Sequence, residues 1–485
     1  MTIRVQVDTP SGSVRGVRRP DSIAFLGIPF AEPPVGSRRF DAPAARIPWE
    51  GVLEADAYGP TPQRHALAEI TSIPEPSIPG EDTLTLNVFT PDTTPDELLP
   101  VFVWIHGGAY LGGSPASPWY DGAAFNRNGI VVVTIAYRLG FDGFGHIPDA
   151  PDNRGVLDQL LALHWVQRHI AAFGGDPGRV TIGGQSAGGS AVLTLLACPS
   201  AAGLFQGAFS ASGVTVDIPP AIAMQRATEV AGRLGVPVLR SGFASVSEEA
   251  VLEAQGDLTP GRGESSLDAV LRLAKGIVND LPYGPIIDGT LLPHPVIEAL
   301  SEGTGASVPL LLGATADEFA GPFVALAAQV DRVDAMTALT GLGLSEGVAT
   351  RYLGALPAAA PTSRVLGRWA TDARFRRVVT AVVDARARAS AGTWVYDFAY
   401  EGAEGLAAHC LDVPFAFDVP FDDAVERIAG TNPPQALADA LHGALAAFVR
   451  TGDPGWPSAT SGAVMRFDRA TERADDAYAS ARALG

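Results

Sequence analysis

Four short runs of almost uninterrupted apolar residues constrain the fold of this chain more than any other feature of its sequence. They cover residues 98–105, 130–136, 180–182 and 308–312. Runs of this kind are typical of strands that are buried on both faces of a parallel sheet. Between the second and third runs, residues 155–172 carry apolar side chains at helical spacing. The order strand, helix, strand predicts a parallel α/β sheet.

Other segments extend this sheet and surround it with helices. β-like segments open the chain, and residues 82–90 alternate apolar and polar side chains as a half-buried strand does. The stretches 219–275 and 321–388 are rich in Ala, Leu, Glu and Arg and predict helices beyond a minimal sheet, and a last helix is expected at about 434–450. No long Gly, Ser or Pro linker divides the chain, so we expect one domain over residues 1–485.

A tight turn that presents a serine follows the third apolar run. Gly184-Gln185-Ser186-Ala187-Gly188 fits the pattern G-x-S-x-G, with a strand-like segment before it and a helix-like segment after it. In that context a serine is held at the apex of the turn as a nucleophile, with the N–H of the next residue beside it. The pattern alone would also fit an ordinary surface turn. Its position between strand and helix favours a nucleophile at Ser186.

A glycine-rich loop follows the first apolar run. His106-Gly107-Gly108-Ala109-Tyr110 comes directly after Ile105. Loops of this type supply backbone N–H groups to the oxyanion of a tetrahedral intermediate. An ordinary glycine turn leaving a strand is the alternative. The loop lies upstream of the nucleophile and at the carboxyl end of a strand, where ligand sites of α/β sheets lie, which favours the oxyanion function.

Further motifs occur in a fixed order along almost the whole chain. They are residues 30–36 (FAEPPVG) with Arg39-Phe40, residues 81–87 (EDTLTLN), residues 137–140 (YRLG), and residues 173–177 (FGGDP) ahead of Ser186. With the two loops above, they resemble the type-B carboxylesterase family, which includes the cholinesterases, and within it the bacterial para-nitrobenzyl-esterase type. The resemblance implies an α/β-hydrolase fold, with a central, mostly parallel sheet flanked by helices and helical cap insertions at about 219–275 and 321–388. It also implies an oxyanion hole made by Gly108, Ala109 and Ala187.

Three histidines follow Ser186 and compete for the role of general base. In α/β-hydrolases the chain order is Ser, then Asp or Glu, then His, which leaves His294, His409 and His442. His442 lies in the expected last helix and His294 in a proline-rich stretch. The segment of His409 resembles the catalytic histidine segment of the family, and we predict His409 as the base.

The acid is expected just after the fourth apolar run, in Ala316-Asp317-Glu318-Phe319. This segment resembles the family motif Asp-Glu-Gly, in which the Glu is the catalytic acid. The resemblance therefore implies Glu318, with Asp317 as the rival. Four positions depart from the family pattern: Phe319 replaces the usual Gly, Gln185 replaces a Glu, Thr83 replaces a disulfide cysteine, and Ala109 replaces the third Gly of the glycine-rich loop.

The resemblance also assigns supporting roles. Ser212 matches a serine beside the family's acid, with a simple turn serine as the alternative. The pairs Arg39 with Glu81 and Arg138 with Asp158 match buried salt bridges of the family. Cys198 and Cys410 show no pattern of a disulfide framework, so we expect two free thiols.

These features predict a serine carboxylesterase that hydrolyses small to medium uncharged esters through an acyl-enzyme, without a cofactor or metal. A lipase acting at an oil–water interface and a non-catalytic, cholinesterase-like adhesion module are the alternatives. The net charge of −19 argues against nucleic acid or an anionic membrane as a partner. No signal-peptide pattern opens the sequence, so a cytoplasmic protein is expected, with a monomer as the favoured state.

Overall fold

The four apolar runs lie close together in the middle of one sheet. The structure is a computed structural model that describes residues 3–64, 73–256, 267–279, 281–422 and 424–485. In it the runs are β6 (Leu99–Ile105), β7 (Val131–Ile135), β8 (Gly175–Gln185) and β10 (Leu310–Thr315). The central order is β7-β6-β8-β9-β10, with β9 (Gly207–Ala211) between β8 and β10, and every pair in it is parallel. The predicted parallel sheet is therefore confirmed.

Shorter strands extend the sheet at both edges. Beyond β7 it continues antiparallel through β5 (Thr85–Thr90), β3 (Ile23–Pro29), β2 (Gly12–Arg18) and β1 (Arg4–Thr9), and β4 (Val52–Glu54) also pairs with β2. Beyond β10 lie β11 (Thr393–Phe398), β12 (Val464–Phe467) and the antiparallel β13 (Glu472–Arg473). The expected strands at the start of the chain and at 82–90 are thus present.

The sequence did not predict β9, β11 and β12. β9 has the sequence GAFSA, in which small residues give little strand signal, yet all five of its residues are buried. It becomes a strand because it lies between β8 and β10, which supply partners for its backbone. β8 begins at Gly175, before the expected residue 180, because Leu99 of β6 already pairs with Gly175, ahead of a break in the register.

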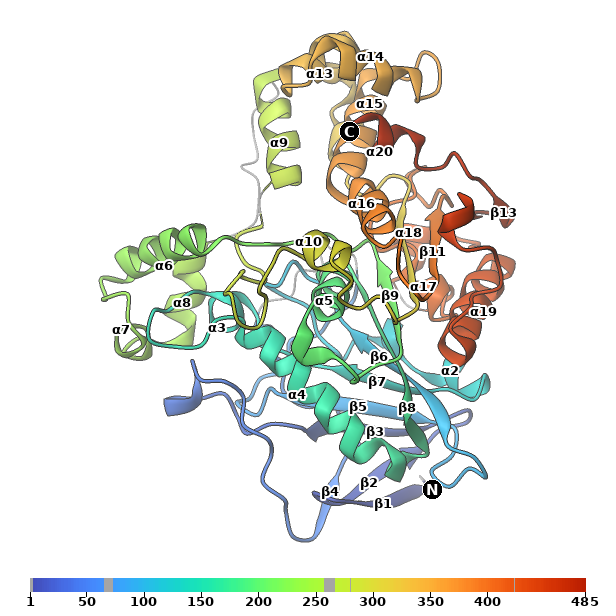
Figure 1. Ribbon diagram of the computed structural model, residues 1–485. Coiled ribbons are helices and arrows are strands. Elements are labelled where there is room, and N and C mark those ends of the chain that lie inside the picture. Colours follow the sequence, from blue (N-terminus) through green and yellow to red (C-terminus); the bar gives the residue numbers. More distant parts are fainter. Residues whose placement is uncertain (1–2, 65–72, 257–266, 280, 423) are drawn as a thin grey trace.

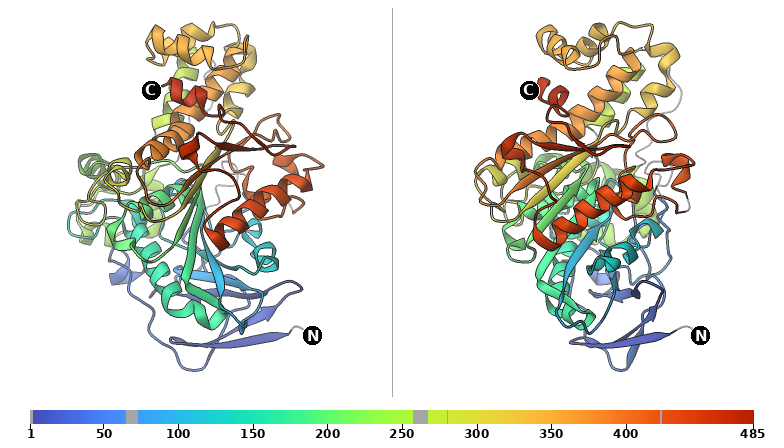
Figure 2. Two further views of the ribbon diagram at one scale, coloured as in Figure 1. Left: turned by 45° about the vertical axis from the view of Figure 1, so that its right-hand side comes forward. Right: turned by 90° about the vertical axis from the view of Figure 1, so that its right-hand side faces the viewer.

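Helices cover both faces of the sheet, because its central strands alternate between two apolar cores. In β6, Val101, Val103 and Ile105 face the core shared with α4 (Arg154–His169) and α5 (Ala187–Leu196), whereas Phe102 and Trp104 face the core shared with α19 (Gln435–Thr451). Figure 2 shows α4 and α19 on opposite sides of the strands. The remaining short helices near the sheet are α2 (Ala123–Arg127), α3 (Gly140–Phe144), α10 (Val296–Ser301), α16 (Arg377–Ala385), α17 (Val413–Ala416), α18 (Glu426–Ala429) and α20 (Ala479–Ala483).

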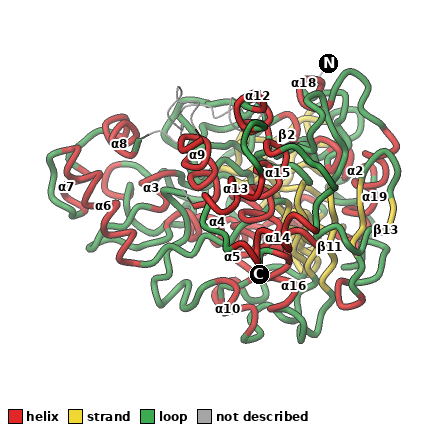
Figure 3. Tube along the Cα trace, turned by 90° about the horizontal axis from the view of Figure 1, so that it is seen from above, coloured by secondary structure: helices red, strands yellow, loops and turns green. Residues whose placement is uncertain are grey.

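Helices also occupy the two stretches where insertions were predicted. The first contains α6 (Pro220–Leu234), α7 (Arg240–Ala244), α8 (Glu248–Gln255) and α9 (Leu267–Asn279), and the second α11 (Gly321–Ala325), α12 (Ala327–Val330), α13 (Ala335–Gly341), α14 (Glu346–Gly354) and α15 (Thr362–Thr371). α9 and α11 to α15 share a third apolar core with Ala483 and Leu484. Of these helices, α9, α13, α14 and α15 form the upper part of the molecule in Figure 1, whereas α6, α7 and α8 lie at its left side. In the view from above, α9, α13, α14 and α15 lie in front of part of the sheet (Figure 3).

Of the two arginine pairs carried over from the family, one is confirmed and one is wrong. Arg138 and Asp158 are buried, and their nearest side-chain atoms are 2.7 Å apart. Arg39 does not pair with Glu81. Its guanidinium instead binds the carboxylate of Asp142 at the start of α3, at 2.7 and 3.1 Å, while Glu81 is exposed. The motif fixes the position of the arginine but not the acid that folds against it.

Both cysteines are buried and unpaired. Cys198 is 2 % exposed and donates to the carbonyl of Leu291, and Cys410 is fully buried. The expectation of two free thiols is confirmed. Among the described residues, no helix is long and apolar enough to cross a membrane.

We predict that neither thiol reacts quickly with a bulky disulfide reagent in the native protein, because burial shields both sulfur atoms and raises both thiol pKa values. Two thiols should react after denaturation without reductant. A thiol titration measures both numbers. Fewer than two reactive thiols in the denatured, unreduced chain would contradict the free state.

Candidate active site

Ser186 occupies a strained turn between the end of β8 and the start of α5. Its backbone has φ 58° and ψ −122°, a region that residues with a β-carbon rarely adopt. The turn is possible because glycine flanks it: a β-carbon at Gly184 would collide with the backbone of Gly188, and one at Gly188 with the carbonyl oxygen of Ile105. The strain directs the serine hydroxyl away from the sheet, at the positive end of a helix.

The glycine-rich loop lies directly against this turn. Gly108, Ala109 and Tyr110 all have positive φ values, so the loop reverses sharply after β6. His106 fixes its start, since it is fully buried, stacks on Tyr137 and places Nδ1 2.9 Å from the carbonyl oxygen of Gly107. Burial lowers the pKa of His106 to about 4, so this ring is neutral and acts as part of the scaffold.

His409 connects Ser186 with Glu318. Its Nε2 lies 2.9 Å from Oγ of Ser186, and its Nδ1 makes a short contact with Oε2 of Glu318. Burial alone would lower the pKa of His409, but its neighbours Cys410 and Glu318 raise that pKa well above its usual range. Burial raises the pKa of the Cys410 thiol and keeps it neutral, so we attribute the rise to the Glu318 carboxylate.

Backbone pairing between two loops determines which acid reaches the imidazole. The N–H of Asp317 donates to the carbonyl of Ala407, and the N–H of His409 donates to the carbonyl of Glu318, at 3.0 and 2.9 Å. The Asp317 carboxylate accepts from the N–H of Ala407 at 3.2 Å and therefore faces the backbone. Glu318, the next residue, extends to the ring of His409.

Ser212 lies beside this acid, where the sequence motif suggested it would. Its hydroxyl donates to Oε1 of Glu318 at 2.6 Å, and the N–H of Thr315 donates to the same oxygen at 2.9 Å. The other Glu318 oxygen remains for His409. Two donors on one oxygen hold the carboxylate in one orientation.

The two rival histidines lie elsewhere. His294 is exposed and pairs with Glu298 one turn along. His442 is buried in α19, with Nδ1 2.9 Å from the carbonyl of Ala416 and Nε2 3.0 Å from the amide of Asn128. Neither has a contact to Ser186 or Glu318 among the described residues, so both serve the scaffold.

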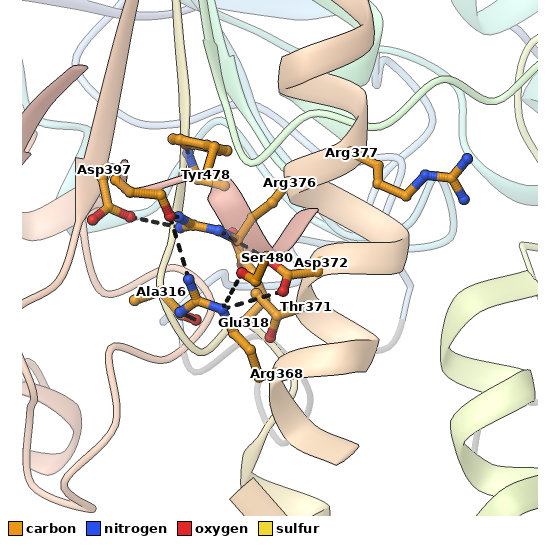
Figure 4. A network of polar contacts seen from close by, with 12 residues as sticks. Ala316, Glu318, Arg368, Thr371, Asp372, Arg376, Arg377, Asp397, Tyr478 and Ser480 are labelled. Carbon is orange, nitrogen blue, oxygen red and sulfur yellow. Dashed lines mark hydrogen bonds and ion pairs between the residues drawn. The ribbon is translucent and has the colours of Figure 1, made fainter. Parts of the chain in front are cut away.

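A buried ion network anchors the loop that carries Glu318. Arg376, in the π-helical turn η5 (Asp372–Arg376), lies between Asp372 and Asp397 at 3.2 and 2.6 Å. Arg376 also donates to the carbonyl of Thr315, and Arg368 donates to that of Ala316. Figure 4 shows the two guanidinium groups beside Glu318 and Tyr478.

Tyr478, near the end of the chain, joins this network to the sheet. Its ring lies under the Arg376 guanidinium, 4.0 Å from the centroid. Its hydroxyl donates to the carbonyl of Tyr396 and accepts from the N–H of Ala314, at 2.7 and 3.1 Å. The strand end that leads to Glu318 is therefore held from the side of the sheet and from the side of the helices.

Sequence reasoning missed several neighbours of the imidazole. The Gln185 amide nitrogen lies 3.3 Å from Nε2 of His409, and the rings of Phe319 and Phe375 stack near the same ring. Elsewhere, buried Glu75 accepts from the Tyr120 hydroxyl at 2.9 Å, and burial raises the Glu75 pKa to about 7. The replacement of the family's Gly by Phe319 was visible in the sequence; the distant Phe375 and Glu75 gave no signal.

Taken together, this geometry joins a serine, a histidine and a glutamate in one line of contacts. A family model described as the carboxylesterase family matches residues 4–478. The chain belongs to the carboxylesterase family. A match of this extent covers the sheet, the glycine-rich loop and Ser186, Glu318 and His409. The chain accordingly has the α/β-hydrolase fold and is a carboxylic ester hydrolase.

Individual carboxylesterases are similar to this chain over about two thirds of its length or more. The para-nitrobenzyl esterase of Bacillus subtilis is 36 % identical over 478 residues, covering 93 % of this chain and 92 % of the relative. Human carboxylesterase 3 is 39 % identical over 334 residues, covering 65 % of this chain and 55 % of the relative. The crystal structure of a Geobacillus stearothermophilus carboxylesterase superposes with a TM-score of 0.84 at 34 % identity and covers 99 % of both chains.

The contacts of the two neighbouring acids predict different effects of their removal. Glu318→Gln should lower kcat for ester hydrolysis by roughly a hundredfold or more, because the imidazole loses the charge that orients it and stabilises its protonated form. Asp317→Asn should lower kcat much less, since Asp317 accepts only from a backbone N–H. Steady-state kinetics on p-nitrophenyl acetate compares the two variants, and the reverse ranking would assign the acid to Asp317.

Proposed function

We propose that this carboxylesterase works as a serine esterase with Ser186 as nucleophile, His409 as general base and acid, and Glu318 as the orienting acid. The proposal is carried by one observation, the line of contacts from Oγ of Ser186 through the ring of His409 to the Glu318 carboxylate. The strained turn at Ser186 and the two further donors to Glu318 support it. These three residues keep the chain order Ser, Glu, His of α/β-hydrolases.

In the acylation step, Oγ of Ser186 attacks the carbonyl carbon of the ester while Nε2 of His409 takes the hydroxyl proton. The new imidazolium is stabilised by the carboxylate of Glu318. When the tetrahedral intermediate collapses, the bond to the alcohol oxygen breaks, and His409 gives its proton to that leaving oxygen. The alcohol departs and the acyl group remains on Ser186.

Water completes the cycle by the same route. His409 takes a proton from water, the hydroxide attacks the acyl carbon, and the second tetrahedral intermediate releases Oγ of Ser186, which regains its proton from His409. The carboxylic acid leaves. Both steps need an unprotonated His409. We therefore expect kcat/KM to rise as the pH rises through the pKa of His409 in the free enzyme.

We further propose that Gly108, Ala109 and Ala187 donate their N–H groups to the oxyanion. Among the described residues, none of these three N–H groups has a backbone acceptor, so they are available to a ligand. Ala187 is the first residue of α5, where an N–H has no acceptor within the helix. Donors of this kind are each worth roughly 3 kcal/mol to the transition state in other hydrolases.

For the substrate, we propose small to medium uncharged esters. The Bacillus subtilis relative is named for para-nitrobenzyl esters, which are esters of this class. A protein with net charge −19 does not attract anionic substrates or anionic lipid surfaces. We propose that the enzyme acts as a monomer in the cytoplasm, where two buried free thiols remain reduced.

The nucleophile can be tested by covalent labelling. A diethyl fluorophosphate-type organophosphate should label the protein once, at Ser186, and abolish ester hydrolysis, because its phosphorus takes the place of the ester carbonyl carbon. Ser186→Ala should remain unlabelled at the same reagent concentration. Peptide mass spectrometry locates the adduct, and loss of activity with an adduct on another residue would refute the assignment.

The shape of the glycine-rich loop predicts which alcohols are accepted. Three residues of the loop have positive φ, and we propose that the loop thereby turns its backbone toward the oxyanion and leaves space beside the alcohol part of the ester. We therefore expect turnover of tert-butyl acetate as well as n-butyl acetate, with the tertiary ester slower. Gas chromatography of the released alcohols measures both rates. Good hydrolysis of the primary ester without detectable tert-butanol would contradict this prediction and leave the nucleophile unaffected.

A further inference from the structure

Two aromatic rings surround the imidazole of His409 on the sides where it makes no hydrogen bond. The centroid of Phe319 lies 4.8 Å from that of His409 with an angle of 28° between the planes, so the two rings are stacked. Phe375 lies 5.1 Å away at 45°. The two phenyl rings also stack on each other at 5.6 Å, so the three rings form one cluster.

The cluster complements the polar contacts of His409. The two ring nitrogens of His409 lie in the ring plane and face Glu318 and Ser186, so the plane is fixed from its edges. Phe319 adds a contact on a face of the ring and limits its rotation. A cation within about 6 Å of a phenyl centroid is also attracted to the negative face of that phenyl ring. His409 carries such a charge only when it is protonated.

We propose that Phe319 is a positioning residue of this enzyme, which holds the imidazole of His409 by stacking and stabilises the imidazolium that forms in each transition state. The proposal rests on the proposed function, since it needs His409 to be the base. Phe319 follows Glu318 directly, so one loop supplies both the carboxylate at the edge of the imidazole and the ring on its face. The family motif has Gly at this position, so a ring here distinguishes this chain from the usual pattern.

The charged and titratable groups around His409 do not supply this contact. Glu318 faces the Nδ1 edge of the ring, and Cys410 and Asp412 come from the same segment as His409. Burial raises the pKa of Asp412 to about 6, and Asp412 accepts from the Tyr396 hydroxyl. On η5, the charged residues are Asp372, Arg374 and Arg376; Asp372 pairs with Arg376, and Arg374 donates to the carbonyl of Val278. A change confined to Phe319 leaves all these groups in place.

The test compares Phe319→Leu, which keeps an apolar side chain but removes the ring, with Phe319→Tyr, which keeps the ring. For Phe319→Leu we expect kcat for p-nitrophenyl acetate to fall about fivefold at the alkaline plateau, with KM nearly unchanged, because one cation–π contact is lost. The acid limb of kcat/KM should move down by about half a pH unit, since the protonated ring is less stable in the free enzyme. Phe319→Tyr should retain the wild-type plateau and limb.

Phe205→Leu is the matched control, because it also removes a phenyl ring from the same core. Phe205 comes just before the start of β9, whereas Phe319 comes just after the end of β10. It should leave the acid limb where it is in the wild type. A Phe319→Leu enzyme with an unchanged acid limb, whether or not kcat falls, would overturn the proposal and reduce Phe319 to a packing residue. Organophosphate labelling of each variant separates this outcome from failure of the proposed function, since wild-type enzyme without an adduct at Ser186 would refute that function instead.

Discussion

The close approach of the turn after β8 to the end of β6 is the constraint on which the site depends. Gly188 lies so near the carbonyl of Ile105 that no side chain fits between them. This contact places the start of α5 against the glycine-rich loop, so the serine and the loop N–H groups face the same space. It is possible only because β6 and β8 are parallel neighbours whose carboxyl ends meet at one edge of the sheet.

The acid and the histidine are held by a second kind of constraint, the hydrogen bonding of two irregular loops to each other. The backbone N–H of Asp317 donates to the carbonyl of Ala407, and that of His409 donates to the carbonyl of Glu318. The two loops are thus paired although neither is a strand. Behind this pairing, Arg376 and Arg368 bind carbonyls of the acid loop. Buried ion pairs often add little net stability, because desolvation offsets their attraction. Here their geometric effect matters more, since they fix the orientation of a loop that has no regular structure.

Much of this arrangement could be predicted from the sequence, because the relevant signals are local. The apolar runs predicted the parallel strands, and the glycines around Ser186 and Gly108 predicted turns that only small residues permit. The features that the sequence could not predict depend on contacts between segments that lie far apart in the chain. Arg39 binds Asp142 rather than Glu81 because the start of α3 folds against it, and Phe375 reaches His409 through a π-helical turn that has no recognisable pattern. β9 was missed for a similar reason, since its strand partners, and not its own residues, make it a strand.

The position of Tyr478 has a consequence for the order in which the protein matures. Its hydroxyl bonds to the backbone of both β10 and β11, and the carbonyl of Ala477 accepts from the two arginines that hold the acid loop. Because a ribosome makes the chain from its amino end, Ser186 and the glycine-rich loop emerge long before these residues do. A nascent chain can therefore form the turn of Ser186 early, whereas the loop of Glu318 acquires these anchors only when translation has passed residue 478. The contact of Glu318 with His409 is in this way tied to the synthesis of a segment that lies far beyond both residues in the chain.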